Sequence, residues 1–178
     1  MTHSEFPMSR LVLAVLTAAL AVYSYFEIQT GLPLLTAHIT THRGATVPVS
    51  QVLSLGLYIS WFLQVFLAAF LLAAPYLAPQ TIHFGSWRLS RYSPAQQQRL
   101  LPLVRELSGL LALLVSGYFS ARIYLEIHDA AAHGPVLPAD WLKNLDRTEI
   151  EWLATLMVIC GIVIYLYVAK FDDAAAGE

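Results

Sequence analysis

The chain has little charge. Only 12% of its 178 residues are Asp, Glu, Lys or Arg, about half of the roughly 25% that is typical of soluble globular domains. Hydrophobic residues make up 57% of the sequence, and the mean hydropathy is +0.60. The shortage of charge excludes an ordinary soluble domain and predicts an integral membrane protein. A net charge of -2 also argues against a nucleic acid partner, because phosphate binding requires a broad basic face.

Cysteine and catalytic motifs are equally scarce. Cys160 is the single cysteine, so no intramolecular disulfide and no thiolate metal site can form within the chain. It lies in an apolar run, and we interpret it as a small hydrophobic residue. The sequence contains no nucleophile elbow, no phosphate-binding loop and no HExxH motif. We therefore expect a protein without enzymatic activity and without a bound cofactor.

Long apolar runs are what the sequence does have, and each is close to the length needed to cross a bilayer core as a helix. The predicted spans cover about residues 11–28, 52–77, 107–127 and 150–169. Short interfacial helices are expected in the loops, because Ser93 followed by Pro94 and Gln96 has the residues of a helix start. Thr148 with Glu151 repeats this capping pattern and predicts the start of the last span. The fold class is thus all-α: one membrane domain with four transmembrane helices in two hairpins.

The loop at 79–106 carries the charge that sets the orientation. Its arginines are expected to contact lipid headgroups; they are Arg88, Arg91, Arg99 and Arg105. In the short helix after Ser93, the apolar side chains should face lipid, and Pro102 should bend the chain toward the third span. These apolar residues are Leu100, Leu101, Leu103 and Val104. Because cytoplasmic loops are enriched in Lys and Arg, this loop and both termini are expected in the cytoplasm.

A few polar side chains fall inside the predicted spans, where an unpaired polar group is costly. Gln64 should therefore face another helix and form a hydrogen bond there. Arg122 and Glu126 stand four residues apart, so they share one helix face and can neutralise each other near the outer interface. Glu27 lies at a similar depth on the first span. We expect these charges either to lock the first and third spans together or to recognise an external peptide or a neighbouring subunit.

Candidate metal ligands lie on the side opposite the basic loop; they are His38, His42, His128 and His133. If the turn that carries His38 and His42 is helical, both imidazoles point the same way, a spacing that suits a divalent metal. Haem or a chlorophyll-type pigment is a further alternative, although haem sites in membrane bundles usually place the histidine within a helix. A solvated or capping role is the simpler interpretation of these side chains.

The order of elements also resembles a known family. After the first span come Leu32-Pro33, then His38 or His42, and Gly44, before the second span begins. The basic loop adds Ile82-His83-Phe84, Tyr92 and Pro94-Ala95-Gln96-Gln97-Gln98-Arg99. From about Leu11 to Lys170 this arrangement resembles the N-terminal membrane unit of the bacterial Sdp-type toxin-immunity proteins and their relatives. The resemblance implies a four-span, non-enzymatic protein of the bacterial cytoplasmic membrane, in a family that shields against a toxin and signals through protein contacts.

Taken together, the residues and the resemblance predict a protein that acts through protein–protein contacts in the membrane. It would be an accessory or scaffold subunit of a larger complex, or an immunity or signalling protein. The alternative is a redox or transport component that binds a cofactor or metal through the outer histidines and acids. An absorption spectrum and a metal analysis of the purified protein would distinguish the two hypotheses.

Overall fold

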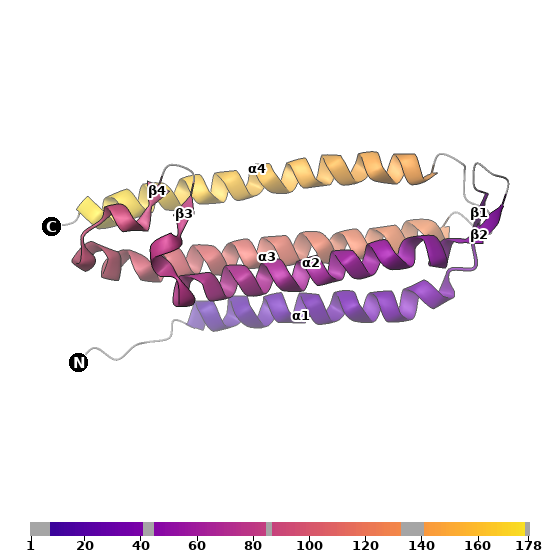
Figure 1. The fold of residues 1–178 in the computed structure, drawn as a ribbon, viewed down its shortest axis with the longest axis horizontal. Helices are drawn as coiled ribbons and strands as arrows, with labels where there is room; N and C mark the ends of the chain where they lie inside the picture. The colour runs from indigo at the N-terminus through magenta and orange to yellow at the C-terminus, as the bar shows by residue number, and fades with distance from the viewer. Residues whose placement is uncertain (1–7, 41–44, 85–86, 133–140, 177–178) are drawn as a thin grey trace.

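The computed structural model is an elongated bundle of long helices (Figure 1) and describes residues 8–40, 45–84, 87–132 and 141–176. The four helices are α1 (Met8–Gly31), α2 (Val49–Leu77), α3 (Pro94–Ala132) and α4 (Trp141–Ala176). Each contains a segment long and apolar enough to cross a membrane. The predicted all-α, four-span architecture is therefore confirmed. The beginning of α1 and the end of α4 lie at the same end of the bundle, as an even number of spans requires (Figure 1).

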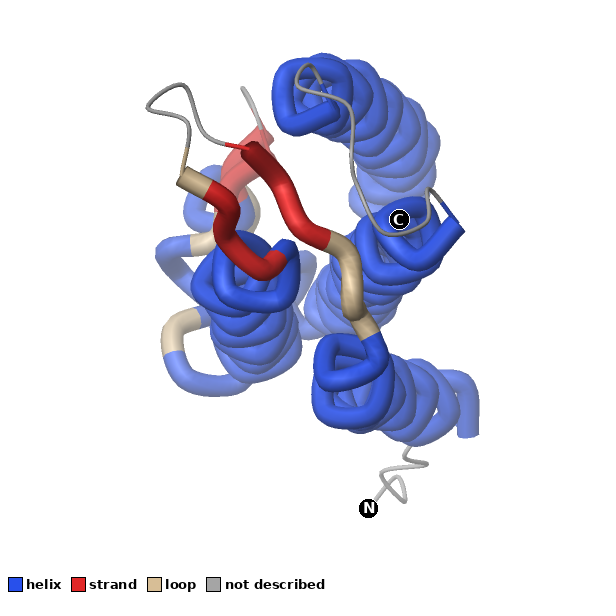
Figure 2. Tube along the Cα trace, turned by 90° about the vertical axis from the view of Figure 1, so that its right-hand side faces the viewer, coloured by secondary structure: helices blue, strands red, loops and turns tan. Residues whose placement is uncertain are grey.

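Short hairpins connect the helices at both ends. A 3₁₀ turn (Leu32–Leu34) and the antiparallel pair β1 (His38–Thr40) and β2 (Thr46–Pro48) join α1 to α2. Figure 2 shows this pair lying across the end of the bundle. At the other end, the 3₁₀ turns Pro79–Thr81 and Leu89–Arg91 flank the pair β3 (His83–Phe84) and β4 (Trp87–Arg88). We call this second end the basic end, after its arginines Arg88, Arg91, Arg99 and Arg105.

Helix α3 is the centre of the bundle. In its most apolar segment 44% of the residues are buried, against 17% in α1 and 22% in α2. Small residues allow the close approach of α1: a Cβ on Gly109 would lie 3.2 Å from Leu13, and one on Gly31 would lie 2.6 Å from Ile127. Such close backbone approach favours van der Waals packing, which drives helix association in lipid.

The connection at the basic end differs from the sequence prediction. The capping pair is present, since the Ser93 amide donates to Gln96 Oε1 over 3.0 Å. However, α3 continues unbroken through Pro102, so no separate interfacial helix forms. Leu100 and Val104 are fully buried rather than lipid-facing. The reason is that the loop and the end of α4 fold over them, in a cluster that also contains Trp87, Leu89 and Phe171.

The last predicted span agrees with the apolar segment Ile150–Asp172, but its capping pattern does not mark a helix start. Helix α4 begins at Trp141, so Thr148 lies inside the helix and does not cap it. Glu151 instead accepts a hydrogen bond from Arg147 Nε over 3.2 Å, one turn earlier on the same helix. An ion pair at this spacing supports a helix that already exists. The Thr148–Glu151 pattern therefore does not mark the beginning of a helix.

Candidate functional site

A polar network joins α1, α2 and α3 in the middle of the bundle. The Ser24 and Ser120 hydroxyl oxygens lie 2.8 Å apart, and Gln64 Nε2 donates to Ser120 Oγ over 3.0 Å and to the Ser116 carbonyl over 3.1 Å. Gln64 is fully buried, so its predicted hydrogen bonding to another helix is present. Gln64 Oε1 and Ser116 Oγ have no hydrogen-bond partner among the described residues. The network thus holds three helices in register but leaves two buried polar atoms unsatisfied.

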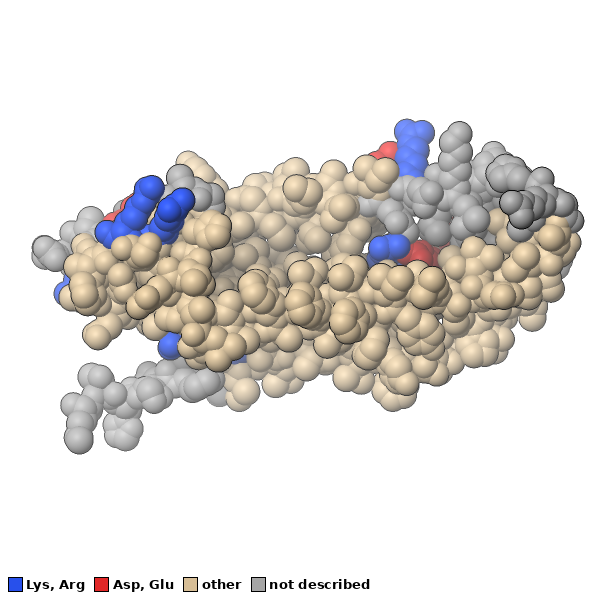
Figure 3. Space-filling view, in the orientation of Figure 1, with Lys and Arg blue, Asp and Glu red and all other residues tan. Residues whose placement is uncertain are grey.

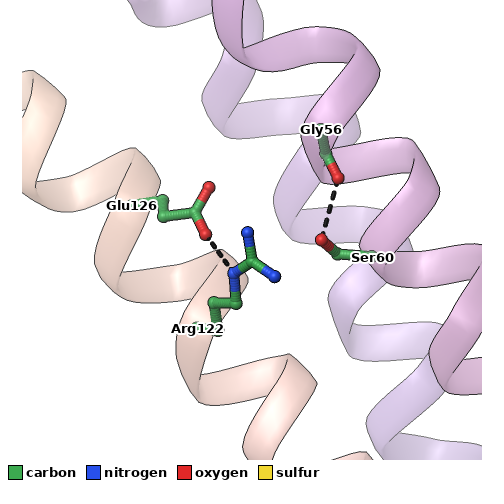
Figure 4. Close-up of polar contacts among 4 residues, drawn as sticks. All are labelled: Gly56, Ser60, Arg122 and Glu126. Carbon is green, nitrogen blue, oxygen red and sulfur yellow. Dashed lines mark hydrogen bonds and ion pairs between the residues drawn. The ribbon is translucent and has the colours of Figure 1, made fainter. Parts of the chain in front are cut away.

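Two charged side chains of α3 lie near this network. Arg122 Nε donates to Glu126 Oε1, so the two charges do neutralise each other as predicted. Figure 4 shows the Arg122 guanidinium between α3 and the turn of α2 that carries Gly56 and Ser60, where the Ser60 hydroxyl donates to the Gly56 carbonyl over 2.8 Å. The Glu126 side chain is 5% exposed and that of Arg122 is 24% exposed.

The depth of this pair follows from the facing helix. Ser60 lies about 16 Å along α2 from Val49, and the whole of α2 is about 43 Å long at 1.5 Å per residue. A hydrocarbon core about 30 Å thick, if it is centred on α2, encloses the pair. The pair then lies deeper than the interface position that the sequence suggested, at a depth where a charge is costly and an ionisable residue is by default a candidate functional site.

The contact that joins the first and third spans involves His128, which the sequence suggested only as a metal ligand. Glu27 Oε1 lies 3.0 Å from His128 Nε2, which joins α1 to α3. The His128 ring packs on Tyr124, with 4.0 Å between ring centroids. Glu27 is thus a structural partner of His128, which lies about half a turn beyond Glu126 on α3.

The structure does not support the helical spacing proposed for a metal site. His38 lies in strand β1, so the turn is not helical at this residue, while His42 and His133 lie outside the described residues. Within residues 8–40, 45–84, 87–132 and 141–176, no group of three or more His, Cys, Asp or Glu side chains could hold a metal ion.

The proposed headgroup arginines divide into two kinds. Arg88, Arg91 and Arg99 are exposed, and Figure 3 shows positive side chains gathered at this end of the molecule. Arg105 is half-buried instead, with its guanidinium carbon 4.4 Å from the centre of the Tyr76 ring on α2. It faces the interior of the bundle because it lies on the same side of α3 as Gly109 and Ser116.

Helix α4 is the least enclosed helix. Only 6% of the residues in its most apolar segment are buried. It is fastened mainly at the basic end, where Phe171 is fully buried with its ring 4.5 Å from Trp87, and the Tyr167 hydroxyl donates to Glu106 Oε1 over 2.7 Å. Toward its beginning, Met157 and Ile150 are 68% and 70% exposed. Figure 3 shows a hollow between α4 and the helices below it.

No family model, no curated protein and no solved structure matches this chain. The geometry of the bundle itself therefore carries the functional argument, and its main features are the buried charge pair on α3 and the open side of α4.

Sequence reasoning missed several residues of these features. Ser24 was not singled out, although hydroxyls placed in apolar spans commonly bond across helices. Tyr167 and Glu106 were not linked, because one lies in a span and the other in what was expected to be a loop. Arg10 was not assigned a contact either, yet its Nη2 donates to the Pro102 carbonyl on α3 over 3.1 Å.

Proposed function

We propose that the protein is a non-enzymatic membrane subunit that binds another transmembrane protein along the open side of α4. The observation that carries this proposal is the exposure of α4 around nearly its whole circumference between Ile150 and Ile159. Apolar side chains are exposed on every face there; they are Ile150, Trp152, Leu153, Met157, Val158 and Ile159. This exposed stretch leaves room for a partner helix.

The Arg122–Glu126 pair also favours a binding site on the open side of α4. Lipid tails solvate an apolar helix as well as a protein does, so exposure of α4 alone gives no driving force for association. Arg122 changes this balance, because a partly exposed guanidinium at hydrocarbon depth is costly. A partner helix packed between α2 and α4 would remove the exposed part of Arg122 from lipid. We therefore expect a partner span that carries a polar or acidic residue.

The location of the protein belongs to the same proposal. With Arg10 and Lys170, the side of the basic end has six positive residues, against four on the other side, which are Arg43, Arg122, Lys143 and Arg147. This excess supports a cytoplasmic position for the basic end and for both termini. Together with the resemblance to the Sdp-type membrane unit, this favours a bacterial cytoplasmic membrane and a role as an accessory subunit or an immunity or signalling protein. Maleimide labelling of a cysteine introduced at Arg91 from outside intact cells should fail, and efficient labelling would contradict the orientation.

Photo-crosslinking in living cells tests the contact directly. A photoreactive residue at Met157 or Ile150 should give one discrete adduct with another membrane protein. The same residue at Leu16 of α1 or Phe66 of α2, which are 46% and 56% exposed, serves as the matched control and should give no such adduct. Equal adducts from all four positions would indicate random collisions, and the absence of any adduct from α4 would refute the proposal.

A further inference from the structure

A second open surface lies on the other side of α3, between α1 and α2. It is an apolar groove of about 410 Å³. Small side chains line its α1 wall and aliphatic ones its α2 wall, among them Ala14, Ala18, Ala21, Val65, Ala69 and Leu72. Tyr25 and Trp61 close the far end, with 5.2 Å between their ring centroids.

The wall of the groove is almost entirely apolar. The Thr17 hydroxyl donates to the Leu13 carbonyl over 2.7 Å, and Trp61 Nε1 donates to the Ala21 carbonyl over 3.0 Å. The polar side-chain groups nearest the groove are therefore used within the bundle. Whatever fills this space is apolar along the groove.

The groove is long and open to one side. Between Ala14 and Tyr25 it runs about 16 Å along α1. One extended hydrocarbon chain lying along this length fits the space.

The end of the groove is positively charged. Arg10 lies one turn beyond Ala14 on α1, and Arg105 stacks on Tyr76, one turn beyond Leu72 on α2. The two arginines lie at about the same height along the bundle axis, because Arg10 donates to the carbonyl of Pro102, one turn before Arg105 on α3.

Both arginines retain a positive charge that no acid among the described residues neutralises. Within the described part of the chain neither side chain forms an ion pair, and Arg10 Nε and Arg105 Nε have no hydrogen-bond partner there. Glu106, the nearest acid along α3, accepts from Tyr167 on the opposite side, toward α4.

We propose that this groove is a binding site for an anionic phospholipid. The phosphate would lie against Arg10 and Arg105, whose planar groups match phosphate geometry, and one acyl chain would fill the groove between α1 and α2. Basic pockets between transmembrane helices are known to hold anionic headgroups. The apolar groove matches the acyl chain of such a lipid, and the two arginines at its end match the phosphate.

Native mass spectrometry of the full chain in mild detergent tests the site. Phosphatidylglycerol should bind at one molecule per chain, about tenfold more tightly than phosphatidylcholine with the same acyl chains. Arg10→Gln and Arg105→Gln should each weaken phosphatidylglycerol binding about fivefold. The matched controls are Arg88→Gln and Arg91→Gln, made separately, each of which removes one positive charge from an exposed position at the same end and should leave the affinity unchanged.

A third variant separates the acyl chain from the headgroup. Ala18 is exposed in the groove, so Ala18→Phe fills the channel without disturbing the core and should abolish one-to-one binding while both arginines remain. Inorganic phosphate should not compete at millimolar concentration. If it competed, and Ala18→Phe had no effect, the site would hold an anion only and the proposed lipid site would be refuted.

The remaining outcomes are equally decisive. Equal affinity for the two lipids, or an equal loss in the Arg88 and Arg91 controls, would reduce the effect to general surface charge and overturn the proposal. If Arg10→Gln failed to fold, Arg105→Lys would keep the charge, lose the planar group and decide the phosphate contact. Crosslinking from Met157 is measured separately, so failure of the lipid site and failure of the α4 contact are distinguishable.

Discussion

Replacing the charge pair of α3 in two steps separates its contribution to folding from its contribution to partner binding. Arg122→Leu leaves Glu126, whose side chain is 5% exposed, as a buried charge with its ion pair removed. Breaking a buried pair in this way costs about 3–5 kcal/mol, whereas replacing both members by apolar residues is often neutral or stabilising. The single variant should therefore be about 3–5 kcal/mol less stable than the native protein. The double variant with Glu126→Leu should recover most of this loss.

Unfolding in mixed micelles, driven by dodecyl sulfate and followed by circular dichroism, measures both free energies. If the double variant were as unstable as the single one, the pair would contribute net stability, and the reasoning from desolvation would be wrong. The folded double variant then tests recognition: crosslinking from Met157 should fall to the level of Leu16, because the polar contact is lost while the bundle persists. Unchanged crosslinking would restrict the pair to a structural role.

Three further predictions use the same unfolding assay. Gln64→Leu should stay within about 1 kcal/mol of the native protein, because the two lost hydrogen bonds average about 0.6 kcal/mol each and the unsatisfied Oε1 disappears with them; a loss above 3 kcal/mol would contradict this. Phe171→Ala should cost about 3–5 kcal/mol, while Leu166→Ala on the exposed side of α4 should cost almost nothing; equal losses would show that α4 is not fastened there. Burial, and then a hydrogen bond donated to Asp172 Oδ1, raise the pKa of Tyr92, so its stabilisation should be complete below about pH 10 and disappear as the pH rises through the raised pKa. Tyr92→Phe should lack this alkaline loss, and an identical alkaline loss in both proteins would exclude Tyr92 as its source.

The helices could be predicted because their signals are local. Uninterrupted apolar runs of about 20 residues identify spans without knowledge of their neighbours. Gln64 was predicted correctly for a similar reason: an amide in hydrocarbon needs a partner, whichever helix supplies it. Ser93 and Gln96 were also correct, since a capping pair depends on residues only three apart.

The errors concern contacts that depend on the relative position of two helices. Glu27 binds His128 because α1 and α3 run side by side with a fixed offset, which also places Leu13 against Gly109. A single sequence does not encode that offset in any local pattern. Leu100 was assigned to lipid for the same reason, because its cover comes from Phe171, 71 positions later in the chain.

The two proposed sites lie on opposite sides of α3, and this arrangement has a mechanical consequence. Arg105 faces the α1–α2 groove, while its neighbour Glu106 is bonded to Tyr167 on α4. Successive residues of one helix thus contact the proposed lipid site and the attached end of α4. Because interhelical hydrogen bonds in membranes average only about 0.6 kcal/mol, the Glu106–Tyr167 bond alone cannot transmit more than about a threefold change in affinity between the sites. Phosphatidylglycerol should therefore change the yield of the Met157 adduct by threefold or less, and a larger effect would require a rearrangement of the cluster around Phe171.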